Sequence, residues 1–358
     1  MTCQFRLSLA LISCCAIVTA AHAASPLLRS PWDGYPVKQT TAPYTCPAVV
    51  HIPTDLTTDS FYRLDDPTHS IVDPARMAAY SKSAAPVKRV GMNIVAAADV
   101  YRSTGSHAAA ECVIEQTVVL AHDRSFAGHM SSNQAYYVQG WVAGAIAIAW
   151  LKVGDSHIAT LQQTTEVGRW LKSIGQQTRE YYDTRTKAGD GKNNHLYWAG
   201  VELAAIAAVA NDRGDFDWSV AAFDQGISQI KPDGVLPLEM QRGQRALHYH
   251  LYALAPLVMI AEFGEANSLD LYAHSNGAIH RLVKLSVSGL QDPSFFEKAT
   301  GIPQEAGKHP SGDQIGWAPP YIARFPNSIL QNYVEQARSL DVYYLGGLPP
   351  PTAAHSHS

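Results

Sequence analysis

Two short segments of the chain concentrate side chains that can hold a carboxylate and move a proton. The first covers residues 191–198 and reads Gly-Lys-Asn-Asn-His-Leu-Tyr-Trp, so an amide, an imidazole, a phenol and an indole lie close together. Asparagine is a favoured helix cap, and a polar loop leading into a helix is the simplest structural interpretation. A helix N-terminus also offers free N–H groups and positive partial charge, which favour a bound carboxylate.

The second segment, residues 242–252, combines arginine with tyrosine. Arg245 and Tyr249 are four residues apart and share a helical face, with Tyr252 close by, while Arg242 lies in the entry to that helix. A guanidinium presents a planar two-donor fork to a carboxylate. A tyrosine can serve as an acid, or as a base where a neighbouring cation lowers its pKa. An arginine-rich helix start with a half-buried tyrosine is the structural alternative.

The elements that must position these segments are helices. After an extended arm and loop rich in Pro, Thr and Asp (residues 25–68), apolar residues recur at three- and four-residue spacing, and short turns separate the runs. Successive helices joined by short turns form antiparallel hairpins, so we expect an all-α fold, an α/α toroid. The spacing predicts helices over about 73–83, 87–103, 106–122, 132–151, 160–182, 195–211, 217–230, 245–263 and 267–288.

The N-terminus has the pattern of a secretory leader. Arg6 precedes an apolar run over residues 7–20, and Ala21-His22-Ala23 offers a small-x-small cleavage site. The run is too short for a membrane span of about 20 residues. We therefore expect a signal peptide over 1–23, a single folded domain over 24–345 and a disordered tail over 346–358. The resulting location is the periplasm, with a lipoprotein anchor as the weaker alternative.

The amino-acid composition limits the kinds of molecule that this protein can bind. A formal net charge of −4 argues against bulk nucleic-acid binding, and an anionic substrate needs a locally positive cleft. Cys46 and Cys112 remain after the leader, and an even pair in an exported protein predicts a disulfide. No spaced Cys/His cluster or carboxylate run predicts a metal site. We expect no cofactor and a monomer with no membrane contact after cleavage.

The two segments, taken with the chain between them, are similar to a known family. The sequence resembles the alginate lyases of polysaccharide lyase family five, the poly-mannuronate lyases. That resemblance implies an incomplete α/α barrel, with Asn194, His195, Arg242 and Tyr249 as the catalytic residues. The motifs that carry it are Asn-Asn-His-x-Tyr-Trp at 193–198, Gly-x-Leu-Pro-x-Glu at 234–239, Arg-x-x-Arg-Ala-Leu-x-Tyr-His at 242–250 and Tyr-Ala-Leu-x-Pro-Leu-x-Met-Ile-Ala at 252–261.

Such an enzyme cleaves an acidic polysaccharide by β-elimination. A base removes the C5 proton of a uronate, and the 4-O-glycosidic oxygen departs. Asn194 and Arg242, with His195 as a further candidate, would neutralise the adjacent carboxylate and stabilise the enolate-like transition state. We expect Tyr249 to be the acid. The base is Tyr249 or His195, and the sequence leaves this open.

Departures from the family pattern concern substrate contacts. The family's lid reads Ser-Lys-Tyr-Glu-Gly-Ser-Asp, whereas residues 60–66 read Ser-Phe-Tyr-Arg-Leu-Asp-Asp, so Tyr62 is the candidate lid tyrosine and Phe61 replaces the lysine. Leu196 stands where serine is common. The expected substrate is mannuronate-rich alginate, with polyglucuronate as its rival. Its sugars are expected to contact Tyr62, Trp141, Trp198, Arg245 and Tyr252.

Two other classes of protein fit the helical pattern. An α/α-barrel glycoside hydrolase needs two carboxylates that flank the scissile bond, for which Glu202 and Glu239 are available. A non-catalytic polysaccharide-binding protein is the third interpretation. Elimination is distinguished from hydrolysis by its unsaturated, ultraviolet-absorbing product.

Overall fold

The computed structural model describes residues 26–305 and 310–351, so the leader expected at 1–23 lies outside the described residues. Within them the regular structure is helical, and β pairing is limited to isolated bridges. Four inner helices pack side by side in the order α1, α3, α5, α8. Their bounds are α1 (Pro74–Thr104), α3 (Asn133–Lys152), α5 (Asn194–Ala210) and α8 (Ala246–Ala266).

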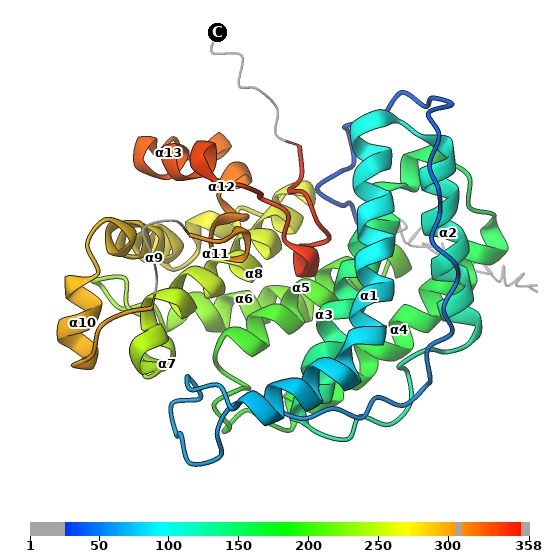
Figure 1. Ribbon diagram of the computed structural model, residues 1–358. Coiled ribbons are helices and arrows are strands. Elements are labelled where there is room, and N and C mark those ends of the chain that lie inside the picture. The colour runs from blue at the N-terminus through cyan, green and yellow to red at the C-terminus, as the bar shows by residue number, and fades with distance from the viewer. Residues whose placement is uncertain (1–25, 306–309, 352–358) are drawn as a thin grey trace, which may run out of the picture.

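Each inner helix forms a hairpin with the outer helix that follows it (Figure 1). The outer helices are α2 (His107–His122), α4 (Leu161–Asp183), α6 (Arg213–Ser228) and α9 (His274–Gln291). Short elements are η1 (Gly154–Ser156), α7 (Pro237–Met240), η2 (Gly243–Arg245), η3 (Leu271–Ala273) and α10 (Ser294–Thr300). This two-layer arrangement is the expected α/α toroid.

The ring is incomplete between α8 and α1, and the C-terminal segment occupies the gap. This segment contains α11 (Gly312–Ile315), α12 (Ala318–Arg324), α13 (Ser328–Gln336) and η4 (Tyr343–Leu345), of which α11 and η4 pack on α8. The Tyr343 hydroxyl lies against Gly91 of α1, where any side chain would collide with it. Glycine at this position lets η4 approach α1.

A buried lysine fixes the C-terminal segment. Lys152 is 1% exposed, and its ammonium donates to the Asp99 carboxylate (2.5 Å) and to the carbonyls of Gly346 (2.5 Å) and Leu348 (2.9 Å). It also lies 5.3 Å from the centre of the Trp32 ring. The expectation that disorder begins at residue 346 is therefore wrong for residues 346–350, which belong to the fold.

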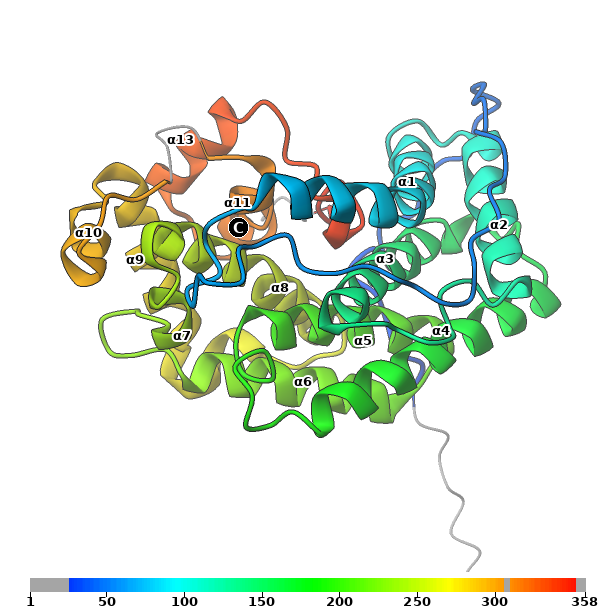
Figure 2. The ribbon, with the colours of Figure 1, turned by 60° about the horizontal axis from the view of Figure 1, so that its bottom comes forward.

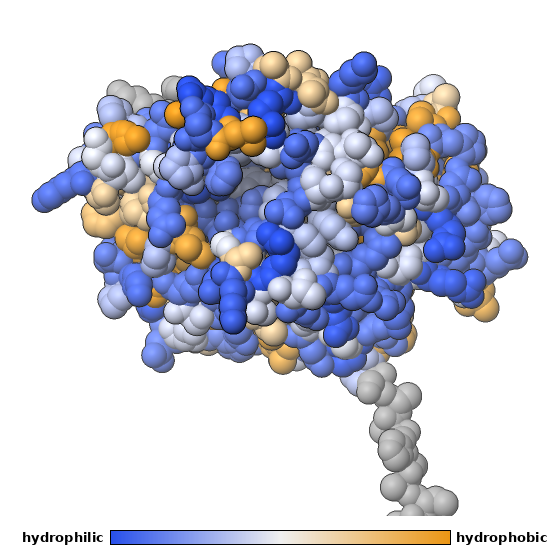
Figure 3. Space-filling model, turned by 90° about the horizontal axis from the view of Figure 1, so that it is seen from below, coloured by the Kyte–Doolittle hydropathy of each residue, from blue (hydrophilic) through white to orange (hydrophobic). Residues whose placement is uncertain are grey.

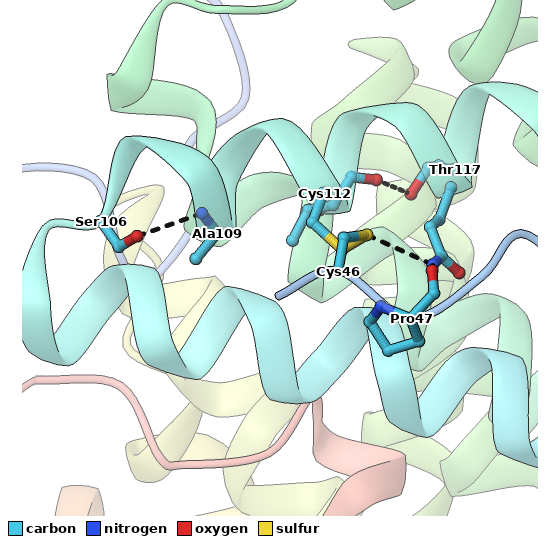
Figure 4. The surroundings of a disulfide bond; sticks show 8 residues. Cys46, Pro47, Ser106, Ala109, Cys112 and Thr117 are labelled. Carbon is cyan, nitrogen blue, oxygen red and sulfur yellow. Dashed lines mark hydrogen bonds between the residues drawn. A yellow bond between two sulfur atoms is a disulfide. The ribbon is translucent and has the colours of Figure 1, made fainter. Parts of the chain in front are cut away.

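The expected N-terminal arm is a strap that crosses the molecule before α1 begins (Figure 2). The predicted disulfide between Cys46 and Cys112 is present, with Cα atoms 5.5 Å apart, and it ties the strap to α2 (Figure 4). Gln116 adds a hydrogen bond from Nε2 to the Pro47 carbonyl (2.7 Å). Further along, Leu56 bridges to Met130 just before α3.

Helix boundaries follow the capping residues. Asp73, Ser106, Ser132 and Asp212 each accept a hydrogen bond from a backbone N–H in the first turn of α1, α2, α3 and α6, and α4 opens with a capping box. One prediction is wrong: the separate helices expected over 73–83 and 87–103 form a single helix. Pro86 removes one helical hydrogen bond, but it lies on an exposed face.

Helix α8 is long and apolar enough to cross a membrane by composition alone. Together with η2 it spans Gly243–Ala266, and 89% of its most apolar window is buried inside the fold. Its hydrophobicity therefore belongs to the core of the ring.

Candidate active site

The cleft of about 1390 Å³ lies between the inner helices, the loop over residues 60–73 and the C-terminal segment. Figure 3 shows a hollow surrounded largely by hydrophilic residues on this side of the molecule. We call residues 60–73 the lid loop. The expected catalytic residues Asn194, His195, Arg242 and Tyr249 all line the cleft.

The first turn of α5 delivers Asn194 and His195. Asn193 caps the helix by accepting from the His195 backbone N–H (3.0 Å). Asn194 is fully buried, and its side-chain amide donates to both oxygens of Glu239 (2.9 and 3.0 Å). Oε1 of Glu239 also accepts the backbone N–H of Asn194 (2.8 Å). Glu239, on the short helix α7, therefore fixes the orientation of Asn194.

His195 lies in a stack of aromatic rings. The centre of its imidazole is 3.9 Å from that of the Tyr137 ring at an interplanar angle of 19°. The Trp141 ring lies 6.3 Å from His195 and 6.2 Å from Tyr137. Burial, together with the positive charge of Arg242, lowers the His195 pKa to about 3. Its Nδ1 is buried with no hydrogen-bond partner among the described residues. The imidazole is therefore neutral near neutral pH, and its Nδ1 is not engaged by another described residue.

Behind this stack, Asp190 organises one wall of the cleft. Its carboxylate accepts from the hydroxyls of Tyr137 (2.7 Å) and Tyr181 (2.9 Å) and from two nitrogens of Arg185 (2.9 and 3.0 Å). Burial opposes ionisation of Asp190, but these hydrogen bonds outweigh it and lower the pKa. The cluster holds the Tyr137 hydroxyl, and it thereby fixes the ring on which the His195 imidazole stacks.

Tyr249 lies at the meeting point of α8 and the lid loop. Its hydroxyl hydrogen-bonds that of Tyr62 (2.8 Å), which also accepts from Arg245 (2.6 Å). The Arg242 guanidinium lies 3.5 Å from the centre of the Tyr249 ring, and that of Arg245 lies 5.2 Å away. Burial raises the Tyr249 pKa even though both arginines oppose this rise, so the phenol keeps its proton.

Arg242 also holds the lid loop. Its guanidinium donates to the carbonyls of Thr68 (2.9 Å) and His69 (2.5 Å). Asp66 shapes this part of the loop by accepting from the backbone N–H groups of Thr68, Ser70 and Ile71. The arginine expected to bind a substrate carboxylate is thus occupied by two carbonyl oxygens.

Four of the five expected sugar-contacting residues line the cleft, namely Tyr62, Trp141, Arg245 and Tyr252. Trp198 does not. It is 3% exposed and packs behind Tyr252 (5.0 Å between ring centres) and Tyr344 (6.1 Å). Its spacing from His195 placed it on the cleft side of α5, but the rings from α8 and η4 cover it.

Several cleft residues carry no signal in the sequence. Lys88 and Tyr344 line the cleft although they come from opposite ends of the domain, and only the closure of the ring brings them together. The link between Glu239 and Asn194 was equally unpredicted, because the motif that contains Glu239 gave no partner for it. His248 also lines the cleft. It stacks on Tyr252 (5.8 Å, 12°), and Gln314 hydrogen-bonds its Nδ1 (3.1 Å).

The carboxylate pair considered for a hydrolase is not available in the cleft. Glu202 is 1% exposed and accepts from the Thr178 hydroxyl inside the helical core (2.9 Å). Glu239 is held under the cleft wall by Asn194. Neither residue lines the cleft, so they do not flank a bound sugar chain. In the described part of the chain, no group of three or more His, Cys, Asp or Glu side chains is placed to hold a metal ion.

Comparisons with known proteins agree with this architecture. The solved structure of an alginate lyase A1-III variant complexed with a tetrasaccharide superimposes with a TM-score of 0.73 at 23% identity, covering 86% of both chains. Alginate lyase A1-III from Sphingomonas species A1 gives a TM-score of 0.71 at 23% identity, covering 90% of both. These likenesses show that the fold is shared.

Sequence similarity establishes the family. A polysaccharide lyase of Stenotrophomonas maltophilia is 35% identical over 288 residues, which is 79% of this chain and 82% of that protein. An alginate lyase of Pseudomonas syringae pv. tomato is 29% identical over 353 residues, covering 95% of this chain and 92% of that protein. The alginate lyase family model matches residues 57–296. The chain therefore belongs to the alginate lyase family.

Proposed function

We propose that this protein is a polysaccharide lyase that cleaves mannuronate-rich alginate by β-elimination. The observation that carries the proposal is the Tyr249 hydroxyl, which meets Tyr62 in a cleft where two guanidinium groups adjoin its ring. Asn194 and His195 line the same cleft. These are a proton donor, a proton acceptor and cations for an anionic sugar chain.

The role of each residue follows from its charge and protonation state. Arg242 exchanges the carbonyls of the lid loop for the uronate carboxylate, a stronger partner because it is charged. Neutralising that carboxylate makes the C5 proton acidic. His195 takes this proton, since of the four it is the group that offers an unprotonated ring nitrogen near neutral pH. The electron pair forms the C4–C5 double bond and expels O4, which Tyr249 protonates.

The choice of polymer rests on family membership and on the lid loop. The relatives from Pseudomonas syringae and Cobetia marina are alginate lyases, and the Stenotrophomonas relative is named more broadly as a polysaccharide lyase. Phe61 packs on Tyr62 (4.5 Å) and Tyr80 (5.0 Å), so it puts an apolar ring where the family pattern has a lysine. This substitution makes polyglucuronate the second candidate substrate.

We also propose that the enzyme acts in the periplasm as a monomer. The leader pattern at the N-terminus supports export. The disulfide between Cys46 and Cys112 supports an oxidising compartment.

Absorbance during incubation with polymannuronate, polyguluronate and polyglucuronate tests the reaction and the substrate together. We expect ultraviolet absorbance to rise fastest on polymannuronate, with one unsaturated uronate for each new reducing end. New reducing ends without absorbance would show hydrolysis instead. Silence on all three polymers would leave a binding protein or another polymer as the explanation.

A further inference from the structure

His250 is a buried histidine that the proposed elimination mechanism does not use. It directly follows Tyr249 in the chain, but it does not line the cleft, and its side chain is fully buried. The imidazole lies between α8, which carries it, the start of α7 and α10, where the Phe296 ring is 5.0 Å away. A polar ring in such surroundings needs hydrogen-bond partners.

The two ring nitrogens of His250 have partners of opposite kind. Nδ1 lies 2.7 Å from the Ala246 carbonyl oxygen, which can only accept, and Nε2 lies 3.0 Å from the Leu236 backbone nitrogen, which can only donate. The proton of a neutral imidazole is therefore on Nδ1. Burial lowers the His250 pKa to about 4, although the Ala246 hydrogen bond and Asp233 oppose this shift. The ring is thus neutral near neutral pH, and its single tautomer satisfies both partners.

Leu236 is the residue at which α7 begins. Its carbonyl oxygen accepts from the backbone N–H groups of Glu239 (3.1 Å) and Met240 (2.9 Å), and its own N–H donates to His250. Leu236 is 1% exposed. Without the imidazole its N–H would be buried and unpaired, which is costly.

The hydrogen bond between Leu236 and His250 closes a loop that carries several site residues. Glu239 and Arg242 lie between these two ends, and the Arg242 backbone N–H donates to the Glu239 carbonyl (3.1 Å). Tyr249 is next to His250 at the α8 end of the loop. The placement of Glu239 and Arg242 relative to Tyr249 is therefore set in part by this one hydrogen bond.

From these contacts we propose that His250 is a positioning residue, which fixes α7 against α8 and so places Glu239 and, through it, Asn194. The inference rests on the proposed function, because it assigns Asn194 to the reaction. His250 does not touch the substrate and transfers no proton. A displacement of about 1 Å at a catalytic group lowers the rate strongly, so the effect of His250 belongs mainly in kcat.

Steady-state kinetics on polymannuronate test the role of the acceptor nitrogen. His250→Phe keeps a ring but removes both hydrogen bonds, whereas the side-chain carbonyl of His250→Gln can still accept from Leu236. We expect kcat to fall about tenfold in His250→Phe, with KM within about threefold of wild type, and His250→Gln to retain most of the rate. His280→Phe is the matched control, because His280 is a half-buried histidine of α9 that bonds the Tyr321 hydroxyl.

A double-mutant cycle tests whether His250 acts through Glu239. We expect kcat of the double variant His250→Phe/Glu239→Gln to equal that of Glu239→Gln alone, because a displaced α7 then has no carboxylate left to position. Losses that multiply would overturn the proposal. So would an unchanged kcat in His250→Phe, an equal loss in His250→Gln, or an equal loss in His280→Phe.

Amide hydrogen exchange separates this proposal from the proposed function. We expect the Leu236 amide to exchange slowly in wild type and in His250→Gln, and residues 236–242 to exchange at least about tenfold faster in His250→Phe, with α6 unchanged. Such a result shows that His250 holds α7 even if no polyuronate is cleaved, in which case the proposed function alone fails. Unchanged exchange in His250→Phe contradicts the proposal, as does fast exchange of the Leu236 amide in wild type, a measurement that needs no variant to fold.

Discussion

Asn194 owes its position in the cleft to one buried carboxylate. Glu239 receives the backbone N–H and the side-chain amide of Asn194 in a fully buried environment. An amide in place of that carboxylate keeps the shape but supplies one acceptor oxygen where two are used. Glu239 therefore acts as a positioning residue.

We expect Glu239→Gln to lower kcat about 10- to 100-fold with a much smaller change in KM, the cost typical of losing a group that orients a functional residue. Steady-state kinetics on polymannuronate check this, with Glu335→Gln on the exposed face of α13 as the control. A change confined to melting temperature would show that Glu239 has only a structural role.

The protonation states of His195 and Tyr249 predict an unusual pH profile. The His195 pKa is lowered to about 3 and that of Tyr249 is raised, so the base is deprotonated and the acid protonated throughout the neutral range. We expect kcat/KM to show no step from either group between about pH 5 and 9. A rise with a midpoint near the ordinary histidine value of about 6.5, lost in His195→Gln, would contradict this assignment.

At the scale of single residues, the sequence predicted those candidate site residues that lie in short local motifs. Asn194, His195, Arg242 and Tyr249 were predicted from the resemblance, and all four line one cleft. Trp198 does not line this cleft, because helical spacing predicts which face of a helix a residue occupies but not which ring will cover it.

At the scale of the structural elements, the conformation of the lid loop depends on Asp66. Burial opposes ionisation of this carboxylate, but its hydrogen bonds with Thr68, Ser70 and Ile71 outweigh burial and lower its pKa. These bonds fold the loop so that the Thr68 and His69 carbonyls reach Arg242. The loop and the catalytic arginine are therefore coupled.

We expect Asp66→Ala to loosen the lid loop, raise KM several-fold and make the loop more sensitive to limited proteolysis. Asp65→Ala is the control, because the Asp65 carboxylate is exposed and accepts its hydrogen bonds from Arg63 of the same loop. Equal proteolysis of the two variants would show that Asp66 does not order the loop.

The sequence predicted most of the long helices but not their exact limits. Pro86 signals a break, yet α1 continues because the lost hydrogen bond lies on an exposed face. The short elements α7 and α10 to α13 were missed, since helices of four to nine residues show too few apolar repeats to be recognised.

For the whole molecule, Glu202 makes stability depend on pH. It is buried between α5, α4 and α3, and burial raises its pKa to about 8, above the value near 4.5 of a free side chain. The folded state therefore holds a proton that the unfolded state releases between these values. Stability should fall as pH rises from about 4.5 to about 8, by about 1 kcal/mol per pH unit.

Glu202→Gln removes this titration, so we expect the variant to gain stability relative to wild type as pH rises from about 5 to 8. Urea unfolding at several pH values measures the difference, with exposed Glu180→Gln on α4 as the control. A constant difference between Glu202→Gln and wild type across this range would mean that Glu202 is ionised in the folded state.

Ring closure is the feature of the whole molecule that sequence patterns could not supply. The C-terminal segment fills the gap between α8 and α1, and Lys152 fixes residues that looked like a disordered tail. A lysine near the end of an apolar helix is ordinarily solvent-exposed, so its burial against two carbonyls depends on tertiary structure alone.

The most direct test of the central claim is the Tyr249→Phe variant, which removes one hydroxyl and keeps the ring beneath Arg242. We predict that its kcat for unsaturated product from polymannuronate falls about 10²- to 10⁴-fold, as expected for loss of a general acid. Binding of polymannuronate, measured by calorimetry, should remain within a few-fold of wild type. If the variant instead retains nearly the full rate of absorbance increase, Tyr249 is not the acid and the proposed elimination mechanism is wrong.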